Sequence, residues 1–280
     1  MLLALVRRGM LIAIVLCTTV TAAPILPTFA PADFTPEAPI DNPYFPLAPG
    51  TTFRWTATIT DPDTQEQASA VDEDHVTSET IQIAGVTARV VHATSFEDDV
   101  QTEDTRDYYA QDKSGNVWYL GEDTKAFEFD DEGNLVNTDT TGSWRAGVNG
   151  ALPGFIMPAN PTVGFEYFQE NAPNDGALDQ AQVVSLTETA NVPFGNFTNV
   201  LKTEETTQAE PGVLEFKFYA PGVGQVMVFE DVQPNGQPLN TFVLESVTTS
   251  PSAIPLPPAI VPGFATLLGA VTVVRRWTGR

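Results

Sequence analysis

Only two histidines occur in the chain, and neither stands in a catalytic or metal-binding motif. His75 lies in an acidic stretch, which favours a solvated turn, and His92 lies in the apolar run 90–93, which favours a strand histidine with a satisfied ring. There is no H-E-x-x-H pair and no G-x-S-x-G nucleophile elbow. A Ser-His-Asp triad would have to use one of these two rings. We therefore expect no enzymatic activity.

Carboxylates are concentrated between residues 97 and 132, where 13 acids stand with three bases. Turns that gather hard oxygen ligands suit Ca²⁺. A calcium loop would take Asp112, Ser114 and Asn116 at positions one, three and five, and Asp123 at position twelve. The loop glycine, however, falls at position four instead of six. The alternative is a hairpin turn with acids on its wet face, so Ca²⁺ is a weak candidate and no other cofactor is predicted.

The charge balance excludes several classes of partner. The chain of 280 residues has a formal net charge of −23, and five of its 13 bases stand in terminal segments without acids. The body therefore carries eight bases against 36 acids, a net of −28. Such a surface repels phosphate, which argues against nucleic acid as a partner. The only cysteine is Cys17, so no intrachain disulfide can form. A carboxylate pair for glycoside hydrolysis stays open, because so many acids single out no pair.

Residues 1–22 have the pattern of a secretory signal peptide. Arg7 and Arg8 form the basic region, 10–16 form the apolar stretch, and Ala22 ends a small-residue cleavage site. The segment 23–41 follows with five prolines, which favours a semi-extended tether. A docked N-terminal extension is the alternative, because this segment also contains apolar side chains.

The body, residues 42–249, has the period-two pattern of β-strands. In 52–60, apolar Phe53, Trp55 and Ile59 alternate with polar residues, and in 214–219 Phe216 and Phe218 alternate with Glu215, Lys217 and Tyr219. Both runs predict half-buried strands with one wet face. Further strands are expected at 80–83, 86–93, 104–110, 116–120, 125–129, 181–189, 198–207, 223–230 and 239–248. We predict a mainly β chain with a single antiparallel β domain, as a meander, half-barrel or sandwich.

Two kinds of turn join these strands. The phrase D-x-x-G-N occurs at 112–116 and again at 130–134, each time between β-rich runs. Asn-Gly at 235–236 indicates a hairpin between the last two strands. The turns favour a meander of neighbouring strands.

The last segment, 250–280, combines a proline motif, an apolar run and a basic end. The motif is Ile254-Pro255-Leu256-Pro257-Pro258, the apolar run is 259–274, and Arg275 and Arg276 follow. Sixteen residues of helix rise about 24 Å, slightly less than the usual bilayer core. Terminal arginines favour a cytoplasmic C-terminus. We predict a C-terminal membrane helix.

This order of parts resembles the PEP-CTERM class of bacterial sorting signals, in its V-P-L-P-A variant. Ile and Pro stand where the variant has its Val and its Ala. The resemblance implies processing by an exosortase-like enzyme at the inner membrane, and association with extracellular polysaccharide in a Gram-negative envelope. The alternative is an ordinary membrane anchor that is not processed.

The body also resembles a group of secreted bacterial β-rich proteins of unassigned activity. The phrases that carry this likeness are N-P-Y-F-P-L at 42–47, Y-A-Q-D-K-S-G-N-V-W-Y-L-G-E-D-T at 109–124 and Y-A-P-G-V-G at 219–224. We expect an exported envelope or matrix protein whose β domain has a structural or binding role. A secreted polysaccharide hydrolase and a carrier of an apolar ligand are the alternatives.

Overall fold

The computed structural model describes residues 23–60, 65–130 and 132–250. The predicted signal peptide with its cleavage site at Ala22, and the predicted sorting motif, membrane helix and arginine pair in 251–280, lie outside the described residues. Within the described part, none of the helices is long and apolar enough to span a bilayer.

The regular secondary structure of the described chain is almost entirely β, which confirms the prediction of a mainly β, antiparallel domain. One short 3₁₀ helix, Pro31–Asp33, precedes the strands. The strands are β1 (Asp41–Asn42), β2 (Phe45–Pro46), β3 (Thr51–Thr60), β4 (Gln67–Ile83), β5 (Val86–Glu97), β6 (Val100–Gln111), β7 (Val117–Phe129), β8 (Leu135–Asp139), β9 (Trp144–Arg145), β10 (Leu152–Met157), β11 (Glu166–Phe168), β12 (Glu170–Asn171), β13 (Asp179–Val192), β14 (Gly195–Thr207), β15 (Glu215–Ala220), β16 (Gly224–Glu230) and β17 (Asn240–Thr249).

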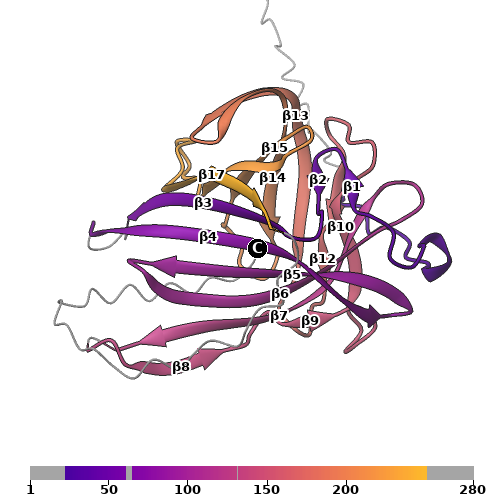
Figure 1. Ribbon diagram of the computed structural model, residues 1–280, viewed down its shortest axis with the longest axis horizontal. Coiled ribbons are helices and arrows are strands. Elements are labelled where there is room, and N and C mark those ends of the chain that lie inside the picture. Colours follow the sequence, from indigo (N-terminus) through magenta and orange to yellow (C-terminus); the bar gives the residue numbers. More distant parts are fainter. Residues whose placement is uncertain (1–22, 61–64, 131, 251–280) are drawn as a thin grey trace, which may run out of the picture.

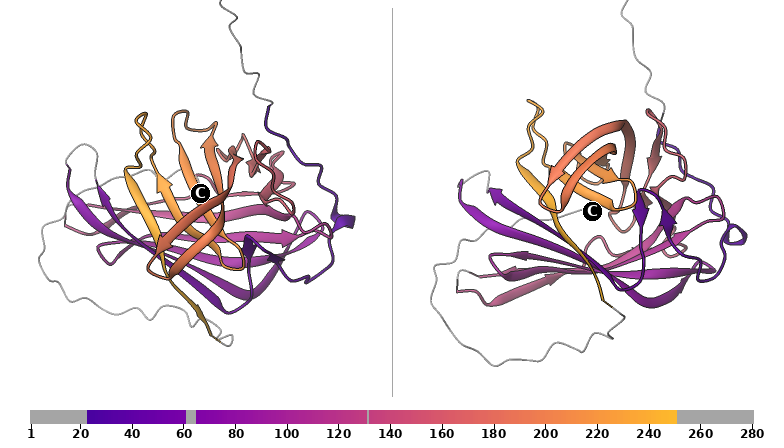
Figure 2. Two further views of the ribbon diagram at one scale, coloured as in Figure 1. Left: turned by 90° about the horizontal axis from the view of Figure 1, so that it is seen from above. Right: turned by 45° about the horizontal axis from the view of Figure 1, so that its top comes forward.

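These strands form one large antiparallel sheet and a two-stranded β1–β2 ribbon. The large sheet has the order β11-β13-β14-β15-β16-β17-β3-β4-β5-β6-β7-β10-β12, with β8 and β9 also paired to β7. In Figure 1, β3–β8 run across the picture and β13–β15 stand nearly upright. Figure 2 shows the β13–β17 part arching over the β3–β8 part. The sheet is therefore a strongly curled meander, close to the predicted half-barrel.

The two ends of this sheet meet at one short stretch of chain. β11 stands at one end of the strand order and β12 stands at the other, and only Gln169 separates these two strands in sequence. Gly154 on β10 lies against this stretch, where a Cβ atom would stand 2.0 Å from the carbonyl oxygen of Phe168. Glycine at this position lets the two backbones approach, which nearly closes the sheet.

The side chains between the two halves of the sheet fill the interior. Tyr119, Tyr167 and Tyr219 are among the largest fully buried side chains. Tyr119 stacks on Tyr109 with ring centroids 4.9 Å apart, and Phe45 of β2 contacts Tyr109 and Tyr219. Aromatic rings of this size supply a large part of the apolar burial that stabilises the domain.

The alternating pattern predicted the buried face correctly in β3 but not in β15. Phe53, Trp55 and Ile59 are buried, as expected. In β15, by contrast, Lys217 and Tyr219 are buried. The prediction of a wet face there is wrong, because the opposite half of the sheet covers that side.

The segment that precedes β1 is docked on the sheet, so the description as a free tether is incorrect and its alternative holds. Ile25 pairs with Tyr167 through backbone hydrogen bonds on both sides of that residue. Phe29 and Phe34 pack edge-on against Trp118. The apolar side chains of the segment are used to cover the sheet.

Both D-x-x-G-N phrases form the same turn, as predicted. Asp112 and Asp130 each donate a backbone N–H to the carbonyl oxygen of the Asn four residues later, and each accepts two backbone N–H groups on Oδ1. The Asn-Gly pair at 235–236 lies in the loop between the antiparallel strands β16 and β17, which confirms that hairpin.

Candidate functional site

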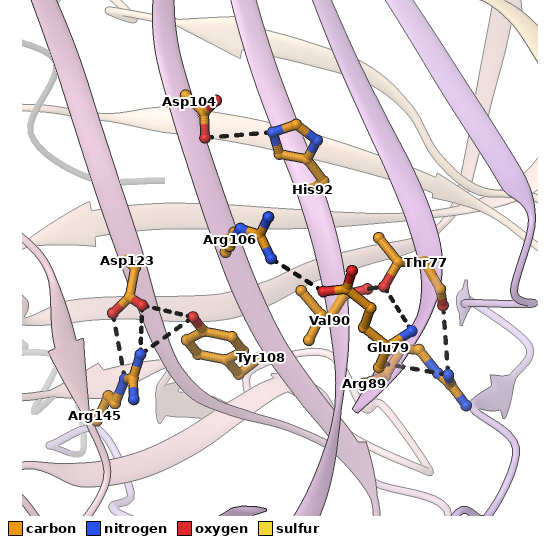
Figure 3. A network of polar contacts seen from close by, with 10 residues as sticks. All are labelled: Thr77, Glu79, Arg89, Val90, His92, Asp104, Arg106, Tyr108, Asp123 and Arg145. Atoms are coloured by element: carbon orange, nitrogen blue, oxygen red, sulfur yellow. Dashed lines mark hydrogen bonds and ion pairs between the residues drawn. The ribbon is translucent and has the colours of Figure 1, made fainter. Parts of the chain in front are cut away.

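The outer face of β3–β7 carries a set of paired polar side chains, which we call the polar ladder. Arg54 contacts Glu73 and Glu245, Arg106 contacts Glu79, His92 contacts Asp104, and Arg145 contacts Asp123 and Tyr108. Figure 3 shows the contacts of His92, Arg106 and Arg145 with their partners. Cross-strand pairs of this kind hold long side chains in place, so the face is ordered as well as polar.

The two histidines lie opposite one another, on β4 and β5. The prediction of a solvated turn at His75 is wrong, because β4 extends over residues 67–83, whereas His92 is a strand histidine with a partner, as expected. His75 Nδ1 lies 2.8 Å from Thr52 Oγ1, and His92 Nε2 lies 3.3 Å from Asp104 Oδ1. The His75 ring thus contacts β3, and the His92 ring contacts β6 on the other side.

The four calcium candidates do not come together. Asp112 accepts hydrogen bonds from the backbone of Ser114 and Asn116, from the Asn116 amide and from Trp118 Nε1. Four donors leave this carboxylate little capacity for a cation. Asp123 on β7 lies opposite Arg106 on β6. Arg106 is six residues before Asp112, so Asp123 and Asp112 are about 20 Å apart along the strand. Strand pairing therefore separates the residues that spacing had suggested, and the described residues contain no group of three or more acids or histidines arranged for a metal.

The interior contains a group of charged side chains that sequence reasoning missed. Six acids and one lysine make up this acid cluster: Asp107, Glu122, Glu170, Asp179, Glu205, Glu215 and Lys217. They come from β6, β7, β12, β13, β14 and β15. Electrostatic interactions connect the members from both halves of the sheet. Six carboxylates cannot all be ionised beside one ammonium in a low-dielectric interior.

At one end of the acid cluster, the hydrogen bonds of Tyr119 require a protonated carboxyl group. The Tyr119 hydroxyl lies 2.6 Å from Asp107 Oδ1 and 3.0 Å from Glu122 Oε2. A phenol has one proton to donate, so a carboxyl proton must supply the second bond. Burial and the neighbouring Asp107 raise the pKa of Glu122 well above its usual range. A proton on Glu122 would therefore account for both bonds.

A bulge in β7 makes this arrangement possible. Tyr119 and Glu122 are three residues apart, and residues three apart on a regular strand point to opposite faces. The pairing of β6 with β7 shifts between Asp107 and Tyr109, and Gly121 has a φ of +138°. The extra residue turns both side chains to the inner face. A glycine within a strand is the one sequence signal that pointed to this place.

The other end of the acid cluster is built around the lysine. Lys217 Nζ lies 2.8 Å from Glu205 Oε2 and 3.5 Å from Glu215 Oε2. Thr203 donates to Glu205 Oε1 over 2.7 Å. Burial alone would lower the pKa of Lys217, but Glu205 and Glu215 together raise it. Lys217 thus stays charged and holds one ionised carboxylate inside the sheet.

The remaining acids of the cluster carry protons into the neutral range. Burial raises the pKa of Asp179 to about 6 and that of Glu215 to about 7. Burial also raises the pKa of Glu170 well above its usual range, and Asp179 adds to this effect. Within the described residues, Glu170 Oε1 and the Tyr167 hydroxyl are buried without a hydrogen-bond partner. These buried acids therefore keep protons at pH values at which exposed carboxyl groups are ionised.

The interior pair of carboxyl groups is shielded from solvent. Asp107 and Glu122 face one another across β6 and β7, yet their exposed fractions are only 5% and 8%. A surface hollow lies elsewhere, between residues 35–40 and the strands β4–β6. Aromatic rings occupy the space beside the pair. This arrangement has the character of a structural polar core.

Comparisons with known proteins give a distant likeness to two solved structures. One is a protein of Bacteroides fragilis NCTC 9343 that is inferred to be exported and has a YmcC-like fold; it shares 13% identity at a TM-score of 0.39, over 74% of this chain and 99% of that one. The other is a protein of Parabacteroides distasonis ATCC 8503 that is inferred to be a lipoprotein, with 13% identity and a TM-score of 0.37, over 73% and 97%. No protein-family model matches the chain, and no curated protein matches it.

Proposed function

We propose that this chain is an exported, non-enzymatic envelope protein whose β domain binds extracellular polymer. The observation that carries the proposal is the contrast between its two faces. The inner face is filled by aromatic rings and buried acids, whereas the polar ladder covers the outer face of β3–β7. A carrier would need an apolar cavity and a hydrolase would need a cleft at its carboxylate pair. A filled interior with an ordered polar face suits surface binding.

The chemistry of the polar ladder favours a hydroxyl-rich partner. Its carboxylates accept hydrogen bonds and its guanidinium groups donate them, which matches the hydroxyl groups of a polysaccharide. The body has a net charge of −28, so a densely anionic polymer would be repelled. We therefore expect binding to a neutral or weakly charged polysaccharide.

The binding proposal is tested by co-sedimentation of the mature chain with extracellular polymer from the native host. Arg106→Gln with Arg145→Gln removes two cations from the polar ladder. Lys113→Gln with Lys202→Gln makes the same charge change elsewhere and serves as the matched control. Loss of binding in the first double variant alone supports the proposal. Equal binding by all three proteins, or equal loss in both variants, contradicts it.

We also propose that export begins with cleavage after Ala22 and that 250–280 is a sorting signal read by an exosortase-like enzyme. An ordinary anchor needs only the apolar run and the basic end, because insertion depends on hydrophobicity and topology on the charged flank. A processed signal needs the proline motif as well. Pro255→Ala with Pro257→Ala should therefore leave membrane insertion intact and cause a longer, membrane-bound form to accumulate. A double variant with the size and location of the wild type would leave a plain anchor.

A further inference from the structure

One arginine of the described chain differs from the other three. Arg54, Arg106 and Arg145 each have a carboxylate within 4.0 Å, whereas Arg89 has none among the described residues. Acids outnumber bases 36 to eight in the body, so an arginine without an acid partner is not what chance placement would give. The exception calls for a physical reason.

The bonds that Arg89 does make leave most of its donors unused. Its Nη1 donates to the backbone oxygens of Thr77 and Glu79 over 3.4 and 3.5 Å, at the weak end of the range. Figure 3 shows that the Glu79 carboxylate is turned to Arg106. A guanidinium has five N–H donors. Neither Nε nor Nη2 of Arg89 therefore has a bond in the described structure.

These unused donors belong to a side chain that lines the surface hollow, which we call the Arg89 pocket. Its polar lining is Thr35, Glu37, Thr80, Thr87, Arg89 and Gln111. The hollow is shallow: its volume is about 10 Å³, room for about one water molecule, so a ligand would lie at its open mouth. Thr80 on β4 and Tyr109 on β6 lie directly opposite Arg89, so the sheet fixes the position of its backbone on both sides. Arg89 is partly buried, and this burial lowers the pKa of its guanidinium group.

We propose that the Arg89 pocket binds a single carboxylate group. The planar fork of a guanidinium matches the two oxygens of a carboxylate, and such bidentate bonds are stronger than neutral ones. The hydroxyls of Thr35, Thr80 and Thr87 line the same hollow and suit the polar remainder of a ligand. Because the body carries a net charge of −28, a ligand with one negative charge is favoured over a dianion. A sugar acid and a simple carboxylic acid share this chemistry.

Glu37 acts as an internal competitor at this site. It stands on the docked N-terminal segment, with a φ of 56° that few non-glycine residues adopt. Its charge attracts that of Arg89 but its carboxylate is beyond ion-pair distance. A ligand carboxylate at Arg89 would be repelled by Glu37, so removal of this charge should tighten binding.

The test is a calorimetric titration of the full mature chain at constant ionic strength with four probes: sodium acetate, sodium glucuronate, glucose and phosphate. We expect both carboxylates to bind, glucose not to bind, and phosphate to bind more weakly. Arg89→Gln should weaken carboxylate binding about tenfold or more, because two charge-assisted bonds are lost. Glu37→Gln, on an exposed residue, should strengthen it several-fold. Lys202→Gln removes a cation that lies over the Phe216 ring, outside this site, and should change nothing.

The two carboxylates separate the sources of the ligand. Tighter binding of glucuronate than of acetate identifies a sugar acid, and equal binding identifies the carboxylate group alone. Binding that survives Arg89→Gln, weakens in Glu37→Gln or falls equally in Lys202→Gln would overturn the assignment. Phosphate binding as tight as that of the carboxylates would overturn it too. The Arg89 pocket and the polar ladder are tested with different variants and different probes, so either proposal can fail without the other.

Discussion

Replacement of Lys217 by Met is the most direct perturbation of the interior. The change keeps a long apolar stem and removes the one cation that faces Glu205 and Glu215 at 2.8 and 3.5 Å. Breaking a buried ion pair by removal of one partner costs about 3–5 kcal/mol, because the remaining charge is left without a partner. We expect this full cost at pH 8, where both carboxylates would have to ionise.

The cost should fall in acid, because burial raises the pKa of Glu215 to about 7 and this group is then protonated. A neutral Glu215 needs no cation, so at pH 5 we expect a smaller loss in unfolding free energy, of about 1–2 kcal/mol. The measurement is urea denaturation of wild type and variant at pH 5 and pH 8.

Lys202→Met on β14 is the matched control. Lys202 lies over the Phe216 ring at 3.6 Å and is not a member of the acid cluster, so its loss should cost below about 1 kcal/mol at both pH values. Equal losses for Lys217→Met and Lys202→Met, or a Lys217→Met loss that does not change with pH, would refute this description of the interior.

Three further predictions concern the same structure. The unfolding free energy of the wild type should fall by about 4 kcal/mol from pH 5 to pH 8. The pKa values of Asp179 (about 6) and Glu215 (about 7) are raised, so the folded state keeps protons that the unfolded chain has released. Urea denaturation across this range measures the change, and a stability that rises with pH would contradict the prediction. Gly154→Ala should cost at least about 3 kcal/mol, because the new methyl group meets the Phe168 carbonyl at 2.0 Å, whereas Gly195→Ala meets only the end of the Phe197 ring at 3.3 Å and should cost much less. Asp112→Ala should cost about 2–3 kcal/mol because it leaves the buried Trp118 Nε1 without an acceptor, and Asp130→Ala in the matching exposed turn should cost below about 1 kcal/mol; equal costs would contradict the difference.

Much of the sheet could be predicted from local pattern. Alternation in 52–60 identified β3 and its buried face, and the D-x-x-G-N phrases identified two hairpin turns. These features depend only on neighbours in sequence. A short polar side chain that bonds its own turn, such as Asp112, can be recognised without knowledge of the rest of the fold.

The acid cluster could not be predicted, because alternation shows which residues share a face but not what covers that face. Lys217 and Glu215 alternate with apolar residues, as charged residues on a wet face do. They are buried because a distant part of the same sheet curls over them. Sequence spacing also did not show how the calcium candidates are placed: Asp112 and Asp123 are near in sequence, but the hairpin places them about 20 Å apart along the strand. Arg89 was missed because its lack of a partner is a property of the fold alone.

The central proposal, an exported envelope protein, is tested most directly by fractionation of native cells and intact mass determination of the protein. We predict that the protein lies outside the inner membrane and that its N-terminus begins after Ala22. A chain found in the cytoplasm with residues 1–22 still attached would contradict the proposal.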